Sequence, residues 1–275
     1  MLLSYRVRSP ERRGFETRIA VSDDGLSFED VWRATKDELE AESIERCAIA
    51  TTNDGVRLYL SYVARADRRW RIASVAARDA TRLDVRSRTE ILTAQMTATV
   101  GVKDPVVVRV DRGWWMFVSA AVADGDSDAL HDRGDAFATG GVRSATGLAV
   151  SDDGMEWEWR GIVLWPAAGA WDAYAARITS VWRQAGLYRA FYDGAAQVRE
   201  NYEERTGLLE SADGVSWRRV TASGPLFARG SLRYVSRLER NARNFFYFEA
   251  ARNGGAHDLR VVSGETSTHE MSRIG

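Results

Sequence analysis

Three acidic side chains stand near the beginnings of segments that read as short inner strands: Glu45, Asp104 and Asp172. When carboxyl groups converge, each charge disfavours ionisation of its neighbour, so that one group stays protonated while another is ionised at the same pH. Cleavage of a glycosidic bond needs such a pair. The residue types therefore predict acid–base chemistry on a carbohydrate or glycoside, with Glu45 as the general acid, Asp104 as the orienting carboxylate and Asp172 as the base or a hydroxyl ligand.

Four cations stand at the same strand starts: Arg46, Lys103, Arg177 and Arg233. Because guanidinium groups bind carboxylates through two parallel hydrogen bonds, this excess of positive charge favours an anionic ligand such as a uronate, with its anionic group between Arg177 and Arg233. The alternative is that each cation pairs with an acid of the chain and that the charges only seal a channel, since buried ionised groups need partners.

Other candidate contacts with the substrate are aromatic or lie on a polar loop. Trp171 could stack on a sugar ring or belong to the core, and tyrosine hydroxyls could donate to sugar hydroxyls. The loop 193–205 carries Glu203 and Glu204, either as reserve acids or as part of a solvated run of charge. Besides the four cations, the residues predicted to bind substrate are Trp171, Tyr174, Tyr202, Glu204 and Tyr234.

An internal repeat determines which elements carry these residues. The segment 146–157 recurs at 17–28 and at 206–217, and each copy is an alternating strand followed by an Asp-Gly turn and an aromatic residue. Degenerate copies at 71–76 and 258–263 bring the number of units to five. Units of about fifty residues predict a propeller whose blades are small antiparallel sheets. The aspartates of the three full copies are assigned to the turns: Asp24, Asp153 and Asp213.

The fold predicted from this repeat is all-β: a single domain over residues 1–275 that forms a five-bladed β-propeller with four-stranded antiparallel blades. The first strand of each blade lines a central channel, so residues at the strand starts converge on one pocket. The first blade is incomplete and is expected to be completed by the C-terminus. The blades are expected at about 1–35, 42–95, 99–165, 170–226 and 228–275.

Five repeats, hairpins of the form Ser-x-Asp-Gly-x-x-Trp/Phe and an Asp-Pro pair opening an inner strand together resemble the five-bladed propeller glycosidases of glycoside hydrolase families 43 and 32. The tripeptide Lys103-Asp104-Pro105 is similar to the Arg-Asp-Pro motif of the invertases in family 32, which implies that Asp104 binds sugar hydroxyls and stabilises the transition state. The order of the acids departs from these families, which place an Asp on the first blade and a catalytic Glu on a later one. Here Glu45 precedes Asp104, and residues 1–20 contain no matching Asp.

Two classes of function besides glycoside hydrolysis stay open. A propeller of this kind could bind a sugar or a partner protein without catalysis. Since the first-blade Asp is missing, the chain could also catalyse a non-hydrolytic reaction of specialised metabolism. In each enzymatic case the expected partner is a small-molecule glycoside or oligosaccharide.

Composition restricts the remaining classes. A formal net charge of −1 leaves no basic excess for binding nucleic acid. Residues 1–8 lack an apolar signal segment and no run is long enough to span a bilayer, so a cytoplasmic protein without a membrane partner is expected.

No cofactor and no zinc site are expected. The acidic spacing of 124–135 partly resembles a structural calcium loop, but Ala129 stands where that loop needs Gly. The single Cys47 is expected to be a small buried hydrophobe.

Overall fold

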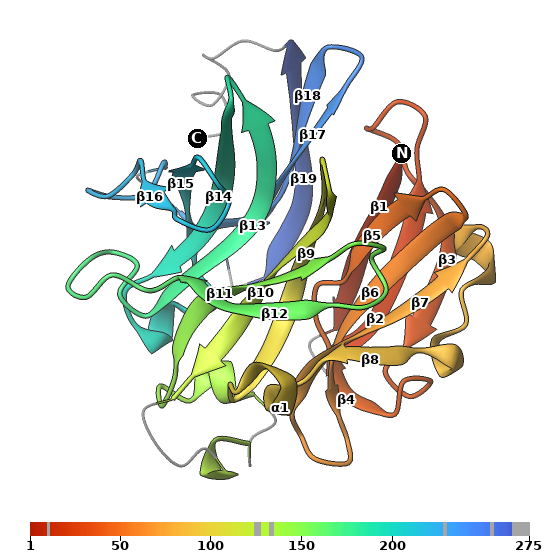
Figure 1. Ribbon diagram of the computed structural model, residues 1–275, viewed down its shortest axis with the longest axis horizontal. Helices are drawn as coiled ribbons and strands as arrows, with labels where there is room; N and C mark the ends of the chain where they lie inside the picture. Colours follow the sequence, from red (N-terminus) through yellow and green to blue (C-terminus); the bar gives the residue numbers. More distant parts are fainter. Residues whose placement is uncertain (10–11, 124–127, 132–134, 228–229, 254–255, 266–275) are drawn as a thin grey trace. The chain divides into compact units, whose positions relative to one another are not determined.

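The computed structural model is all-β, as the repeat predicts (Figure 1). It describes residues 1–9, 12–123, 128–131, 135–227, 230–253 and 256–265. Its strands follow one another as antiparallel groups, each made from neighbouring segments of the chain. In chain order these strands are β1 (Leu2–Ser9), β2 (Arg12–Val21), β3 (Glu29–Thr35); β4 (Ala41–Ile44), β5 (Ala48–Thr52), β6 (Gly55–Ala64), β7 (Trp70–Ala77), β8 (Thr89–Leu92); β9 (Gly101–Val110), β10 (Gly113–Val122), β11 (Arg143–Ser151), β12 (Glu158–Leu164); β13 (Ala175–Gln184), β14 (Leu187–Ala195), β15 (Arg205–Ser211), β16 (Arg218–Arg219); β17 (Leu232–Arg240), β18 (Arg243–Ala251) and β19 (His257–Glu265).

The chain divides into two compact units. Unit 1 comprises residues 1–142 and 147–162, and unit 2 comprises residues 143–146 and 163–275. In unit 1, β1, β2 and β3 form one sheet, β4 and β5 both pair with β6, which continues to β7 and β8, and β9 pairs with β10. In unit 2, β13 to β16 pair in order, and β17, β18 and β19 form a further antiparallel run.

Two parts of the fold differ from the sequence prediction. The segment 43–50, expected as one inner strand, is broken at residues 45–47 into β4 and β5. In the described part of the chain, the first and last groups have three strands each rather than four, and β19 pairs with β18. Residues 266–275, which were expected to complete the first blade, lie outside the described residues.

The Asp-Gly turns are built alike in the three full repeats. In the central copy, the Ser151 hydroxyl accepts the Gly154 N–H at 2.8 Å, and Asp153 Oδ1 accepts the backbone N–H groups two and three residues further on, at 2.7 and 3.1 Å. The same contacts recur around Asp24 and Asp213. The predicted structural role of the three aspartates is confirmed.

We expect Asp213→Ala to destabilise the protein at pH 7 by about 1 kcal/mol, because two backbone N–H groups and the Ser211 hydroxyl lose their acceptor. The backbone donors of Ser216 and Val215 are the main causes that lower the pKa of Asp213 to about 2. A carboxylate whose pKa is lower in the folded than in the unfolded state contributes stability above its unfolded pKa, and that contribution is lost as the pH falls through the folded pKa. In denaturant titrations the deficit should therefore shrink between about pH 4 and pH 2; a deficit that does not change with pH would contradict this account.

Apolar side chains form separate clusters within each unit. In unit 1, one cluster surrounds Leu58 of β6 and another surrounds Val102 of β9. In unit 2, Phe191 and Phe246 pack together from β14 and β18. Cys47 lies in the first of these clusters with 5% of its surface exposed, and burial raises the pKa of its thiol to about 11. The prediction that Cys47 is a buried hydrophobe is confirmed.

Candidate functional site

The inner strands are bulged or broken where the sequence places its charged residues. In β9, Asp104 and Pro105 together oppose the single residue Val118 of β10. Strands β13 and β17 carry similar irregularities next to Arg177 and Arg233, and β4 is separated from β5 at residues 45–47. A bulge re-aims side chains and is over-represented beside active sites. The local backbone therefore marks the same positions that the sequence singled out.

In unit 1, the structure brings Glu45 and Asp104 into one hydrogen-bonded group. The backbone N–H of Arg46, next to Glu45, donates to Asp104 Oδ1 at 3.2 Å. The backbone N–H of Asp104 donates to Ser61 Oγ at 3.0 Å, and its φ is +55°. Both carboxylates are buried, with 2% exposure each, and Glu45 forms an ion pair with the guanidinium of Arg6. The two acids expected to work together are thus linked through a single backbone amide.

Lys103 supplies positive charge next to Asp104. Its Nζ lies 3.9 Å from Asp104 Oδ2, and it stands 5.1 Å from the ring centroid of Trp70 and 4.6 Å from that of Phe137. Trp70 Nε1 donates to Asp135 Oδ1 at 3.3 Å. Aromatic faces attract a cation, and they do so more strongly where water is excluded. Lys103 is therefore held as a buried cation beside Asp104.

In unit 2, Glu204 lies between the two guanidinium groups that were expected to bind a ligand anion. Its Oε1 accepts from Arg177 Nη1 at 2.9 Å and its Oε2 from Arg233 Nη1 at 2.8 Å. Arg177 also donates to Ser144 Oγ at 2.6 Å and to Asn201 Oδ1 at 2.5 Å. The place proposed for an anionic ligand is thus occupied by a carboxylate of the chain. Glu204 is buried here rather than part of a solvated charge run, whereas the neighbouring residue 203 is exposed.

Arg233 has a second acidic partner. Its Nη2 lies 2.9 Å from Glu249 Oε2. Burial alone would lower the pKa of Arg233, but the charges of Glu204 and Glu249 outweigh it and raise that pKa. This cluster contains two guanidinium groups, on Arg177 and Arg233, and two carboxylates, on Glu204 and Glu249. The charges of these four groups sum to zero. The predicted local excess of positive charge is therefore wrong for unit 2, because loop 193–205 and strand β18 supply acids that sequence spacing did not place there.

Asp172 belongs to a different group of side chains in unit 2. Its Oδ2 accepts from Arg219 Nε of β16 at 2.6 Å, so its ionic partner comes from the outermost strand of its group and not from an inner strand. Trp171 donates to the Thr221 carbonyl at 3.0 Å, and its ring lies 5.4 Å from that of Tyr192. Burial, followed by the charge of Asp172, raises the pKa of Tyr192. The three predicted acids are therefore not brought into one group within either unit.

The three candidate tyrosines differ in exposure. Tyr174 is buried, Tyr202 is 41% exposed and Tyr234 is half-buried at the bulge of β17. Two acids on second strands were not predicted from the sequence: Asp193 and Glu249, which pair in register with Arg177 and Arg233. Asp193 and Glu249 could have been identified from the sequence only if the pairing register of the two hairpins had been known. The sequence also did not predict Arg6, Ser61, Asn201 and Arg219.

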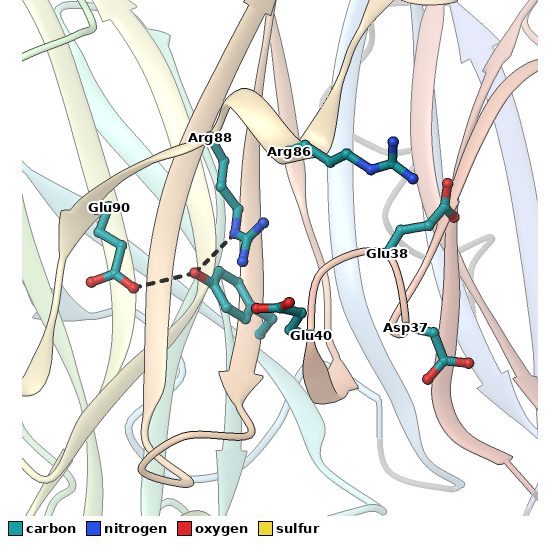
Figure 2. A pocket seen from close by; sticks show the side chains of 7 residues that line it. Asp37, Glu38, Glu40, Arg86, Arg88 and Glu90 are labelled. Atoms are coloured by element: carbon teal, nitrogen blue, oxygen red, sulfur yellow. Dashed lines mark hydrogen bonds between the residues drawn. The ribbon is translucent and has the colours of Figure 1, made fainter.

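Unit 1 also has an open polar pocket of about 580 Å³ that contains none of the predicted site residues. Tyr62 is one of its lining residues; its hydroxyl donates to Glu90 Oε1 at 3.4 Å and accepts from Arg88 Nε at 3.3 Å, and Figure 2 draws these two hydrogen bonds as dashed lines that end at Glu90 and Arg88. Arg88 also donates to two backbone carbonyls. The residues lining the pocket are Asp37, Glu38, Glu40, Tyr62, Arg86, Arg88 and Glu90. The pocket is therefore lined by more acidic than basic side chains, and one of its arginines, Arg88, already donates hydrogen bonds within the chain.

Within the described ranges, no group of three or more His, Cys, Asp or Glu side chains is arranged to hold a metal ion. Most of the segment that partly resembles a calcium loop, at 124–127 and 132–134, lies outside those ranges. Among the helices that the structure describes, none has the length and apolar character needed to cross a bilayer.

Similarity to known proteins is found in structure and not in sequence. No protein-family model and no curated protein sequence matches the chain. A thermostable family-43 glycoside hydrolase matches with a TM-score of 0.68 at 10% identity, over 96% of this chain and 92% of that one. The chain has the fold of the propeller glycoside hydrolases.

Two further structures, a phosphorylase and a glycosidase, are similar to the chain. The β-1,2-mannobiose phosphorylase from Listeria innocua, solved with β-1,2-mannobiose, matches with a TM-score of 0.63 at 13% identity, over 94% of this chain and 67% of that one. The α-L-arabinofuranosidase from Lactobacillus brevis matches with a TM-score of 0.62 at 15% identity, over 94% and 86%. At these identities the likeness is one of fold.

Proposed function

We propose that this chain is a carbohydrate-active enzyme of the glycosidase type, built as a single five-bladed propeller with Glu45 and Asp104 as its catalytic carboxylates. The observation that carries the proposal is the hydrogen bond from the Arg46 N–H to Asp104 Oδ1, because it links the backbone next to Glu45, at the break between β4 and β5, to the carboxylate at the bulge of β9. The fold shared with glycoside hydrolases supports the same chemistry. Arg46 and Lys103 complete the polar surroundings of the pair.

The partners of each acid favour a division of roles. The Arg6 guanidinium beside Glu45 favours the ionised carboxylate, which suits a general base or nucleophile better than the general acid assigned from sequence. Asp104, held by a backbone N–H and close to Lys103, suits the binding and orientation of sugar hydroxyls. Since the guanidinium groups of unit 2 are already paired with carboxylates, we propose a neutral glycoside as substrate.

The test is a substrate panel with a variant of Asp104. Wild-type protein is assayed on β-1,2-mannobiose, with and without inorganic phosphate, and on 4-nitrophenyl glycosides that include the α-L-arabinofuranoside. On any substrate that the wild type converts, Asp104→Asn should lower kcat/KM by roughly tenfold to a hundredfold, since a hydrogen bond to a charged group contributes about 1.5–3 kcal/mol. Asp111→Asn is the matched control, because Asp111 is exposed in the turn that follows β9. Equal kcat/KM in wild type and Asp104→Asn would overturn the assignment.

A carbohydrate-binding protein without catalysis is the second candidate. The observation that favours it is the pairing of buried charges within the chain, since Arg6 with Glu45, and Glu204 with two arginines, satisfy each other without a ligand. Saturable binding of a panel sugar, unchanged in Asp104→Asn and accompanied by no turnover in the wild type, would select this function over the enzyme.

A further inference from the structure

Ser61 of β6 contacts the backbone of both candidate acids of unit 1. Its carbonyl accepts the N–H of Glu45 at 2.9 Å, and its hydroxyl accepts the N–H of Asp104 at 3.0 Å. Ser61 is 0% exposed, so both hydrogen bonds lie away from solvent. One residue of a second strand therefore holds the two segments that carry Glu45 and Asp104.

The backbone is irregular at both positions that Ser61 contacts. The strand pairs that flank the break between β4 and β5 leave residues 45–47 opposite residues 60 and 61, so the inner segment carries one extra residue. Asp104 has a φ of +55°, which is uncommon for a residue with a side chain and costs free energy. Such a conformation persists only where the surroundings hold it. The hydrogen bond from the Asp104 N–H to Ser61 contributes to that restraint.

Three hydrogen bonds close a ring that contains both acids. Two of them are the bonds that Ser61 accepts from the backbone. The third is the bond from the Arg46 N–H to Asp104 Oδ1 at 3.2 Å. Because Arg46 follows Glu45 in the chain, this ring fixes the Asp104 carboxylate relative to the backbone of Glu45. Removing the Ser61 hydroxyl opens the ring at one bond and leaves the carbonyl that accepts from Glu45 in place.

We propose that Ser61 is the positioning residue of the candidate site, and that its hydroxyl holds the Asp104 carboxylate in the orientation that binds substrate. This inference rests on the proposed function, in which Asp104 orients sugar hydroxyls. Ser61 acts through Asp104, since it is fully buried itself. Groups of a binding site have to be held within about 0.5 Å of their productive geometry, so loss of the hydroxyl should weaken the contribution of Asp104.

The experiment is a double-mutant cycle of Ser61→Ala and Asp104→Asn, measured as kcat/KM on a glycoside of the panel that the wild type converts. In the wild-type background Ser61→Ala should lower kcat/KM about tenfold, as for the loss of one hydrogen bond. In the Asp104→Asn background the same substitution should lower it less than about twofold, because the charged carboxylate is already absent. A purely structural role of Ser61 would give the same fold-loss in both backgrounds.

Ser180 of β13 provides the matched control. Its hydroxyl also accepts a backbone N–H at 3.0 Å, that of Arg237 on β17, but this bond lies in unit 2. Ser180→Ala should therefore stay within about twofold of the wild-type kcat/KM. A second comparison does not depend on the folding of Ser61→Ala. Ser61→Thr keeps the hydroxyl and should retain more activity than Ser61→Cys, because a thiol is a weak acceptor.

The outcomes separate this inference from the proposed function. If Asp104→Asn lowers kcat/KM but Ser61→Ala does not, or if the two losses multiply in the double variant, the role of Ser61 is overturned and the proposed enzyme stands. Equal kcat/KM in Ser61→Thr and Ser61→Cys, at equal melting temperature, also overturns that role. If Asp104→Asn leaves kcat/KM unchanged, or if the wild type converts no glycoside of the panel, the proposed function fails and this inference fails with it.

Discussion

Replacing Glu204 by alanine is expected to destabilise the protein by about 3 kcal/mol, because it leaves the buried guanidinium groups of Arg177 and Arg233 without their shared carboxylate. Removing one partner of a buried ion pair costs about 3–5 kcal/mol. The lower end applies here, since Arg233 keeps Glu249 and Arg177 keeps the carbonyl oxygen of Asn201. The melting temperature should fall by roughly 6–12 °C.

The neighbouring residue Glu203 gives a matched control. It has the same side chain one position away on the same loop, but it is exposed. Glu203→Ala should therefore change the free energy of unfolding by less than about 0.5 kcal/mol. Glu204→Gln, which preserves shape and removes the charge, should fall between the two. Denaturant titrations of the three variants measure these differences; equal effects of the two alanine substitutions would show that Glu204 is not the bridge between the arginines.

The strand pattern was readable from sequence because it depends on local signals. An alternating run that ends in Ser-x-Asp-Gly forms its strand and turn from residues of a single hairpin. Asp153 and Asp213 accept hydrogen bonds from backbone N–H groups of their own turns, so each turn is stabilised locally. The repeat segments 146–157 and 206–217 contain the ends of β11 and β15, at Ser151 and Ser211, directly before their turns. Such elements are specified by chain neighbours, so one sequence is enough to place them.

Partners of the buried charges could not be read in the same way. Asp172 pairs with Arg219, which is 47 residues away in the sequence, and Arg177 pairs with Glu204, which is 27 residues away. These choices depend on hairpin register and on the bulges of the inner strands, and a one-residue change in register would send each side chain to the opposite face of its sheet. Sequence spacing placed Arg177 and Arg233 at strand starts and left open whether their anion is a ligand or an acid of the chain; the structure gives them Glu204.

Glu45→Gln is expected to lower kcat by roughly a hundredfold to ten-thousandfold on any glycoside that the wild type converts, if Glu45 is the base or nucleophile of the proposed enzyme. The amide keeps the shape of the side chain but cannot accept a proton or attack the anomeric carbon. Steady-state kinetics of wild type and Glu45→Gln on the same glycoside measure this loss.

The structural effect of the substitution has to be separated from the chemical one, because Glu45→Gln also removes the partner of the buried Arg6. Glu16 provides the comparison: it lies in the same unit on β2, is 2% exposed, and pairs with Arg18 and Arg33. Glu16→Gln should therefore destabilise the fold without lowering kcat per folded molecule. If Glu16→Gln and Glu45→Gln lower kcat equally at equal folded fraction, then Glu45 contributes only its ion pair, and the carboxylates of unit 1 are structural.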